Sequence, residues 1–170
     1  MTDQPSTIYD ETTTIAEARE QLRQNADDGT TCPCCRRYYR AYRRSITRSQ
    51  VLFLLALYKE ARRLAIKIDH ATGERRGLST LPINARAIQG QYMRGGDYAK
   101  LAYWVLITPI ADMPGHWSIT PLGIRWLSGY VSVRRYAHVL DGNVLHHSGP
   151  NWSVDDAYRA PFNLAELLNA

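Results

Sequence analysis

Three cysteines stand within four residues, in the order Cys32-Pro33-Cys34-Cys35. Cys32 and Cys35 have the C-x-x-C spacing with which a tight turn presents two thiolates to one zinc ion. Because one such pair is half of a tetrahedral site, Cys34, His70 or a second chain has to supply the rest. Two alternatives stay open: inert cysteines, or a redox pair at a helix N-terminus, which needs a βαβ setting that the sequence does not show.

Arginines dominate the stretch that follows the cysteines. At the helical rotation of about 100° per residue, six of them fall within one arc of roughly 140°, on a helix that begins at residue 36. They are Arg36, Arg37, Arg40, Arg43, Arg44 and Arg48. Such a face can neutralise several phosphates, since the planar guanidinium makes paired hydrogen bonds to phosphate. The alternatives are a solvated helix face and one that docks an acidic N-terminal arm.

The charge of the chain is unevenly placed. The net charge is +5 overall, with an acidic excess in residues 1–35, a strongly basic stretch over residues 36–63 and a nearly balanced remainder. This asymmetry indicates an anionic partner, or an acidic arm that folds onto a basic helix. Neither a signal peptide nor an apolar run of about 20 residues is present, so we expect a cytoplasmic protein without a membrane partner.

Other candidates for chemistry are weaker. His138 and the pair His146-His147 flank a hairpin and could meet a metal ion across the strands, but polar edge residues are the commoner case. Asp155 and Asp156 are better explained by the dipole of a short helix. The sequence lacks a glycine-rich phosphate loop, a G-x-S-x-G elbow and an H-E-x-x-H motif, which favours a binding protein over an enzyme.

Helices on either side of the cysteines are expected to position these residues. Thr14 and Glu17 form a capping-box pair at the start of a first helix, which Asp27-Asp28-Gly29 ends. Residues 36–46 read as an amphipathic helix. Thr47 with Gln50 can cap the next helix, whose apolar core spans residues 51–64.

The rest of the chain alternates short elements. We expect a strand over 78–83, helices over 84–93, 97–106 and 122–127, and a hairpin formed by 107–109 and 116–120. Asp141-Gly142 predicts a second tight hairpin, because both residues tolerate positive φ angles. Ser153 starts a short helix, and residues 163–168 form the last one.

From residue 47 to residue 127 the order is helix, strand, helix, helix, hairpin, helix, which is the order of a winged helix-turn-helix. The segments 97–107, 116–120 and 121–123 resemble the recognition helix, wing and following helix of MarR-like bacterial proteins, above all in the Ile-Thr-x-x-Gly run that ends at Gly123. On the reading helix Tyr98, Leu101 and Val105 should face the core. Arg94, Lys100 and Tyr103 should face outward with Asp97, and Trp104 sits at the margin. Few of these are basic, so the winged helix either contacts DNA or serves as a scaffold.

A wider resemblance covers most of the chain. The runs 14–23, 27–35, 38–44, 94–107 and 136–148 are similar to a family of small proteins encoded by phages and prophages of actinobacteria. Eighteen arginines against three lysines agree with a GC-rich genome. The resemblance implies a setting rather than a mechanism. In that family Gly often follows Cys-Pro-x-Cys, as in zinc knuckles, whereas Arg36 stands here.

Together these observations predict an α+β, mainly α protein with a winged-helix core over residues 47–130. Residues 1–46 form an acidic arm, a cysteine turn and an arginine-rich helix, and residues 131–170 form a hairpin with short helices. The expected function is DNA binding by a transcription regulator. The alternative is a protein-binding inhibitor or adaptor directed at a host or defence protein. The partner is therefore double-stranded DNA or a host protein, zinc is the candidate cofactor, and a homodimer stays open.

Overall fold

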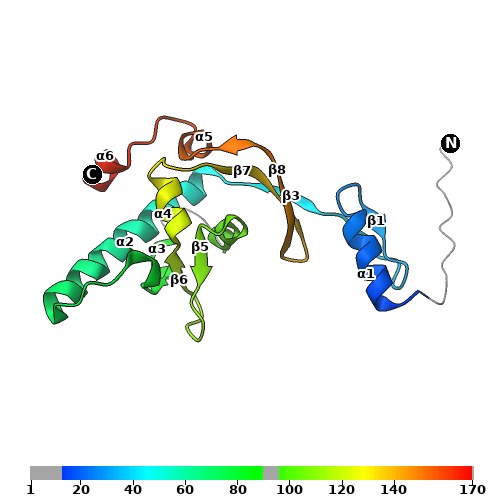
Figure 1. Cartoon of the computed structure of the whole chain (residues 1–170), viewed down its shortest axis with the longest axis horizontal. Helices are drawn as coiled ribbons and strands as arrows, with labels where there is room; N and C mark the ends of the chain where they lie inside the picture. Colours follow the sequence, from blue (N-terminus) through cyan, green and yellow to red (C-terminus); the bar gives the residue numbers. More distant parts are fainter. Residues whose placement is uncertain (1–12, 90–95, 170) are drawn as a thin grey trace. The chain divides into compact units, whose positions relative to one another are not determined.

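The computed structural model describes residues 13–89 and 96–169 of an α+β protein (Figure 1). The chain divides into two compact units. Unit 1 comprises residues 1–44 and 137–147, and unit 2 comprises residues 45–136 and 148–170. The boundary that the sequence suggests after residue 46 lies near the first division, and the predicted segment 131–170 contributes to both units. None of the described helices is both long and apolar enough to cross a membrane.

Unit 1 begins with helix α1 (Ile15–Gln24), which starts at the predicted capping box of Thr14 and Glu17. The helix ends at Asn25, before the Asp-Asp-Gly run. Strands β1 (Thr30–Thr31) and β2 (Tyr38–Tyr39) then pair antiparallel on either side of the cysteine turn. Strand β3 (Tyr42–Ser45) follows and forms a sheet with the C-terminal hairpin in the order β3-β7-β8.

The predicted helix over residues 36–46 is therefore wrong, because this stretch holds β2, β3 and extended chain. Two backbone hydrogen bonds close the cysteine turn, from Cys32 N–H to the Arg37 carbonyl at 2.8 Å and from Arg36 N–H to the Cys32 carbonyl at 2.9 Å. The turn returns the chain against β1, and tyrosine favours strands. Helical spacing of the arginines carried no information about the backbone, since exposed arginines suit a strand equally well.

Unit 2 is organised around helix α2 (Arg48–Thr72), which the Thr47–Gln50 capping box starts as predicted and Gly73 ends in the left-handed conformation. One face of α2 is buried against the elements that follow it. These elements are η1 (Leu78–Thr80), β4 (Ile83–Asn84), α3 (Ala85–Gln89), η2 (Asp97–Trp104), β6 (His116–Ile119) and α4 (Pro121–Leu127). Strand β5 (Ile107–Pro109) instead contacts η2 and β6. Strands β4, β6 and β5 form an antiparallel sheet in that order.

The core of unit 2 contains large side chains. Phe53, Leu54, Leu101 and Trp126 are fully or almost fully buried, and Leu55 is nearly so. Leu101 thus lies in the core as predicted, whereas Val105, which was predicted to face the core too, is 59% exposed. The strand predicted over 78–83 is also wrong, because its first half is the 3-10 turn η1 and only its last residue enters β4.

The C-terminal hairpin joins β7 (Val133–Leu140) to β8 (Asn143–Trp152), and its turn end belongs to unit 1. Asp141 and Gly142 have φ values of 49° and 80°, which confirms the predicted turn. Ser153 caps the short helix α5 (Val154–Tyr158), as expected, and α6 (Leu164–Asn169) ends the described chain.

Candidate functional site: a basic segment and an aspartate–histidine cluster

Residues 36–44, which we call the arginine–tyrosine segment, form the most basic surface of unit 1. No acidic residue lies between Asp28 and Glu60 in the sequence. All five arginines of the segment are exposed. Tyr38 and Tyr42 are 64% and 65% exposed, and the Arg44 guanidinium lies 5.4 Å from the centre of the Tyr42 ring. Charged planes and exposed rings thus alternate along an extended chain.

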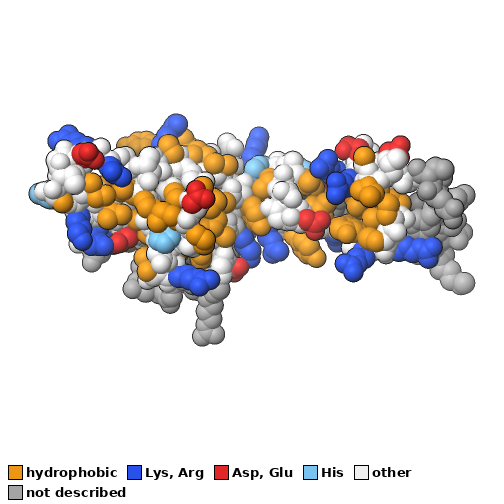
Figure 2. Space-filling view, turned by 90° about the horizontal axis from the view of Figure 1, so that it is seen from below, with side chains coloured by type: hydrophobic (Ala, Val, Ile, Leu, Met, Phe, Trp, Pro, Cys, Tyr) orange, Lys and Arg blue, Asp and Glu red, His pale blue; other side chains and the backbone are white. Residues whose placement is uncertain are grey.

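The six predicted arginines do not share one helix face. Five belong to the arginine–tyrosine segment: Arg36, Arg37, Arg40, Arg43 and Arg44. Arg48 instead lies in the first turn of α2 in unit 2, with its guanidinium 4.7 Å from the centre of the Tyr158 ring. On the face shown in Figure 2, Lys and Arg side chains lie beside hydrophobic ones, a class that includes tyrosine. The structure therefore replaces a helical stripe with a basic segment that runs from the cysteine turn through β2 into β3.

The cysteine turn has one buried and two exposed thiols. Cys32 is buried, whereas Cys34 and Cys35 are exposed. A hydrogen bond from the backbone N–H of Cys35 lowers the pKa of the Cys32 thiol, burial raises it, and the N–H of Cys34 lowers it further. Arg36 has a φ of 58°, in the left-handed region where zinc knuckles place glycine. The turn thus accommodates Arg36 without losing its tight shape.

Zinc at the cysteine turn stays a prediction. Within the described residues, no cysteine belongs to a group of three converging metal-ligating atoms. His70, the fourth ligand considered from the sequence, lies in the last turn of α2 in unit 2.

The predicted reading helix differs from expectation. Residues 97–104 form the 3-10 helix η2 rather than an α-helix through residue 106, and Asp97 makes no side-chain cap. Val105 follows in the left-handed conformation, because the Thr120 hydroxyl holds its carbonyl at 2.6 Å and the Thr120 N–H binds the Leu106 carbonyl at 3.0 Å. These bonds hold the chain where it turns into β5, which begins two residues later at Ile107.

Little charge is available on η2. Lys100 forms an ion pair with Asp97 at 2.6 Å, so the two charges offset each other. Tyr103 is half-buried, and Trp104 is buried with its indole N–H donated to the Arg134 carbonyl at 2.7 Å. Arg94 lies outside the described residues. Of the outward-facing residues predicted for this element, the described ones form a nearly neutral surface.

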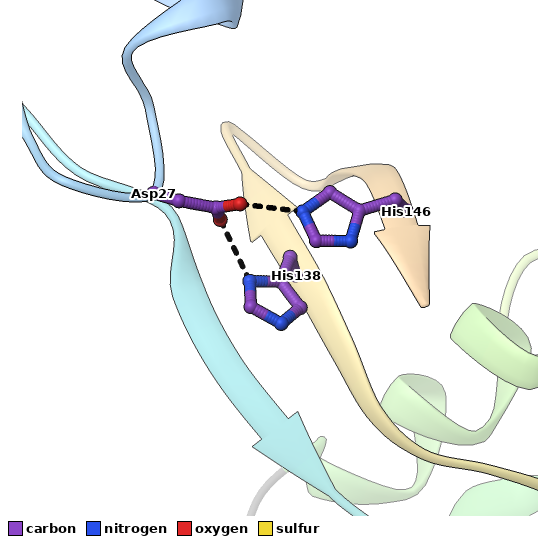
Figure 3. Close-up of side chains that lie close together, drawn as sticks. All are labelled: Asp27, His138 and His146. Atoms are coloured by element: carbon purple, nitrogen blue, oxygen red, sulfur yellow. Dashed lines mark hydrogen bonds and ion pairs between the residues drawn. The ribbon is translucent and has the colours of Figure 1, made fainter. Parts of the chain in front are cut away.

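An aspartate and two histidines that the sequence did not connect meet in unit 1 (Figure 3). Asp27 follows α1, His138 lies on β7 and His146 lies on β8. His138 Nδ1 is 2.7 Å from one carboxylate oxygen of Asp27, and His146 Nε2 is 2.6 Å from the other. The two imidazole rings stack, with their centres 4.1 Å apart. We call these three residues the aspartate–histidine cluster.

The carboxylate is the electrostatic centre of the cluster. Burial raises the pKa of Asp27, but hydrogen bonds from His146 and His138 outweigh it and hold this pKa below its usual value. The His138 side chain is 16% exposed, against 45% for His146 and 48% for Asp27. A pocket of about 450 Å³ reaches this carboxylate and is lined by Asp27, Arg40, Ala41, Tyr42, Arg43 and His138. Two arginines of the arginine–tyrosine segment thus share a pocket with part of the cluster.

No protein-family model matches the chain, and neither a curated protein nor a solved structure matches it.

Proposed function

We propose that this protein binds double-stranded DNA and that the arginine–tyrosine segment is its main contact surface. The observation that carries the proposal is the set of five exposed arginines on one extended stretch of unit 1, without an acidic residue among them. Guanidinium groups hold phosphate oxygens through paired hydrogen bonds, and each neutralised phosphate releases counterions. The exposed tyrosines add flat apolar surface beside these charges.

The element order of unit 2 supports DNA binding, although its helix η2 carries almost no net charge. The order α2, β4, α3, η2, β5, β6, α4 and the sheet order β4-β6-β5 agree with a winged helix-turn-helix. In this proposal η2 occupies the position of the reading helix and contributes base contacts through Lys100 and Tyr103. The protein would then act as a transcription regulator in a phage setting, as the resemblance of the sequence implies.

A salt titration tests the main surface. Each phosphate contact contributes about −0.9 to the slope of log affinity against log salt for duplex DNA. Replacing Arg40 and Arg44 together with glutamine should therefore flatten the slope by about 1.8 and weaken all sequences alike. Fluorescence anisotropy with a labelled duplex at several salt concentrations measures both quantities.

A matched control separates a local contact from net charge. Arg75 and Arg76 are exposed in the connection between α2 and η1, so Arg75→Gln with Arg76→Gln removes the same charge from unit 2. We expect this control to keep the slope of the unaltered protein. Equal effects of the two double variants would contradict a contact by the arginine–tyrosine segment.

One observation favours a second function, the binding of a host protein. The Lys100–Asp97 ion pair leaves η2 nearly neutral, which suits a protein contact better than a DNA groove. Affinity capture from host lysate with and without nuclease distinguishes the two. DNA-dependent recovery supports the proposed function, whereas one stoichiometric protein that survives nuclease supports the second.

A further inference from the structure

The described residues of unit 1 bury very few large hydrophobic side chains. Its described residues that are both buried and hydrophobic are Ala18, Ala26, Cys32, Ala41, Ala137 and Val139. Unit 2, by contrast, buries a tryptophan, a phenylalanine and several leucines completely. Small folds that cannot bury enough apolar surface usually depend on disulfides or metal ions. Because the three cysteines are free, a metal ion is one of the remaining kinds of fastening, beside association with a second chain.

Only one set of side chains in the described parts of the chain brings three metal-ligating atoms together. Asp27, His138 and His146 each offer an atom, and these atoms lie within 4.8 Å of one another. The residues come from three separate segments of unit 1, the loop after α1 and both strands of the hairpin. Figure 3 shows the carboxylate and the two rings pointing toward one another.

We propose that Asp27, His138 and His146 bind one divalent transition-metal ion, with Zn²⁺ the foremost candidate, and that this ion fastens the β7–β8 hairpin to the loop after α1. Two imidazoles with one carboxylate suit Zn²⁺ and its neighbours in the first transition row. Mg²⁺ and Ca²⁺ prefer oxygen ligands throughout. The proposal goes beyond DNA binding and does not depend on it.

The distances fit an ion after small side-chain rotations. Tetrahedral zinc with bonds of about 2.0–2.2 Å holds its ligand atoms about 3.4 Å apart. The two Asp27 contacts, at 2.6 and 2.7 Å, involve different carboxylate oxygens. Whichever oxygen binds the ion, its contact with the nearer ring nitrogen would lengthen by about 0.7 Å to meet this value. The ring nitrogens, at most 4.8 Å apart, would approach by no more than about 1.4 Å. Two of the three side chains are nearly half exposed and free to make such rotations.

The surrounding charges also decide what completes the site. One carboxylate offsets half of a divalent charge, and Arg40 and Arg43 line the adjoining pocket with further positive charge. These arginines reduce the affinity for a cation, yet they favour an anion beside it. Since three protein ligands leave one tetrahedral position open, we expect water or the oxygen of an anion to occupy it.

Cobalt spectroscopy on the full chain tests the site. Co²⁺ added to metal-free protein should give the intense visible bands of a four-coordinate ion at one equivalent. His146→Gln should weaken this binding by more than about tenfold. His147→Gln is the matched control, because it makes the same change one residue along β8, outside the cluster, and it should bind as the unaltered protein does.

A second variant separates the cluster from the cysteine turn. Cys32→Ser with Cys35→Ser should keep the visible bands, because the proposed ligands are nitrogen and oxygen. Loss of all binding in this variant, or sulfur-to-cobalt charge-transfer bands that persist unchanged in His146→Gln, would overturn the proposal.

Hydrogen exchange gives a readout that does not depend on a variant's folding. Zn²⁺ should slow amide exchange in the loop after α1 and in the turn end of the hairpin of the unaltered protein. Unchanged exchange in both segments at saturating Zn²⁺ would contradict a fastening role.

Discussion

Gly123 offers the sharpest test of the packing in unit 2. A Cβ atom placed on this residue would lie 2.1 Å from the Leu106 carbonyl oxygen and 3.0 Å from a side-chain carbon of Ile119. Real Cβ contacts essentially never fall below 3.0 Å, so Gly123→Ala requires the two backbones to separate by at least about 0.9 Å. The Leu106 carbonyl cannot move freely, because it accepts hydrogen bonds from the Thr120 N–H at 3.0 Å and the Thr120 hydroxyl at 3.2 Å.

The expected cost follows from these opposing effects. Overpacking of a close-packed site costs about 1–3 kcal/mol, and a weakened hydrogen bond adds about 1 kcal/mol. Alanine regains about 1 kcal/mol over glycine in a helix. Gly123→Ala should therefore lower the free energy of unfolding by about 1–3 kcal/mol, although the same exchange ordinarily stabilises a helix.

Urea denaturation followed by tryptophan fluorescence measures this cost, because all four tryptophans belong to unit 2. Gly77→Ala is the matched control, since Gly77 has an ordinary φ of −66° and nothing within 4 Å of its added Cβ. The control should be neutral or gain up to about 1 kcal/mol. A Gly123→Ala protein as stable as this control would refute the close approach of α4 to the Leu106 carbonyl.

Two further predictions concern unit 2. Leu55→Ala should lower the free energy of unfolding by about 2–5 kcal/mol, whereas Ile66→Ala, 54% exposed on the same helix, should cost less than about 0.5 kcal/mol in the same urea titration. The Ser153 backbone N–H and then its hydroxyl lower the pKa of the Asp156 carboxyl, so an NMR titration should place its midpoint below the ordinary value of about 3.9. The capping box then stabilises α5 above the unfolded pKa and loses this effect as the pH falls through the folded pKa, and a midpoint at or above the ordinary value would contradict it.

Elements with local chemical signals could be predicted from the sequence. The Thr47–Gln50 capping box satisfies backbone N–H groups at the start of α2, and Thr120 does the same before Pro121 at the start of α4. The Asp141-Gly142 turn reverses the chain within two residues. The Ile-Thr-x-x-Gly run has a physical basis. The Thr120 hydroxyl caps α4 and donates to the carbonyls that precede β5, and Gly123 lets α4 approach the Leu106 carbonyl closely. Such signals need no knowledge of distant residues.

Elements that depend on distant partners could not be predicted in the same way. Residues 36–46 have a helical arginine period, but pairing of β2 with β1 and of β3 with β7 decides the conformation of the strands in this stretch. Helix η2 ends at Trp104, and the Thr120 hydroxyl binds the carbonyls of the next two residues. Helical spacing does not show these hydrogen bonds. In both cases the prediction assumed a helical period, but the backbone hydrogen bonds that decide the conformation come from elsewhere in the chain.

The sequence raised a cross-strand meeting of His138 with His146-His147 as the less common case, but it did not identify the aspartate–histidine cluster, for two reasons. Asp27 lies 111 and 119 residues from its two partners in sequence, and the sequence offers it a local role in ending α1. A strict two-residue turn at Asp141-Gly142 would also pair His138 with Leu145 and point His146 to the other face of the hairpin. The rings nevertheless stack 4.1 Å apart, so a residue-by-residue register from the turn alone fails at this point.

The two proposals together make a last prediction, because the arginine–tyrosine segment belongs to unit 1, whose described residues bury few large hydrophobic side chains. If a metal ion fastens unit 1, removing it should loosen the segment that holds phosphates and leave the core of unit 2 intact. A chelator in magnesium-free buffer should therefore weaken duplex binding by the unaltered protein without shifting the tryptophan-detected urea midpoint. His146→Gln protein should bind as weakly as the chelated protein, with or without the chelator. A chelator effect of full size in His146→Gln would mean that a different metal ion supports DNA binding, and the link between the cluster and the arginine–tyrosine segment would fail.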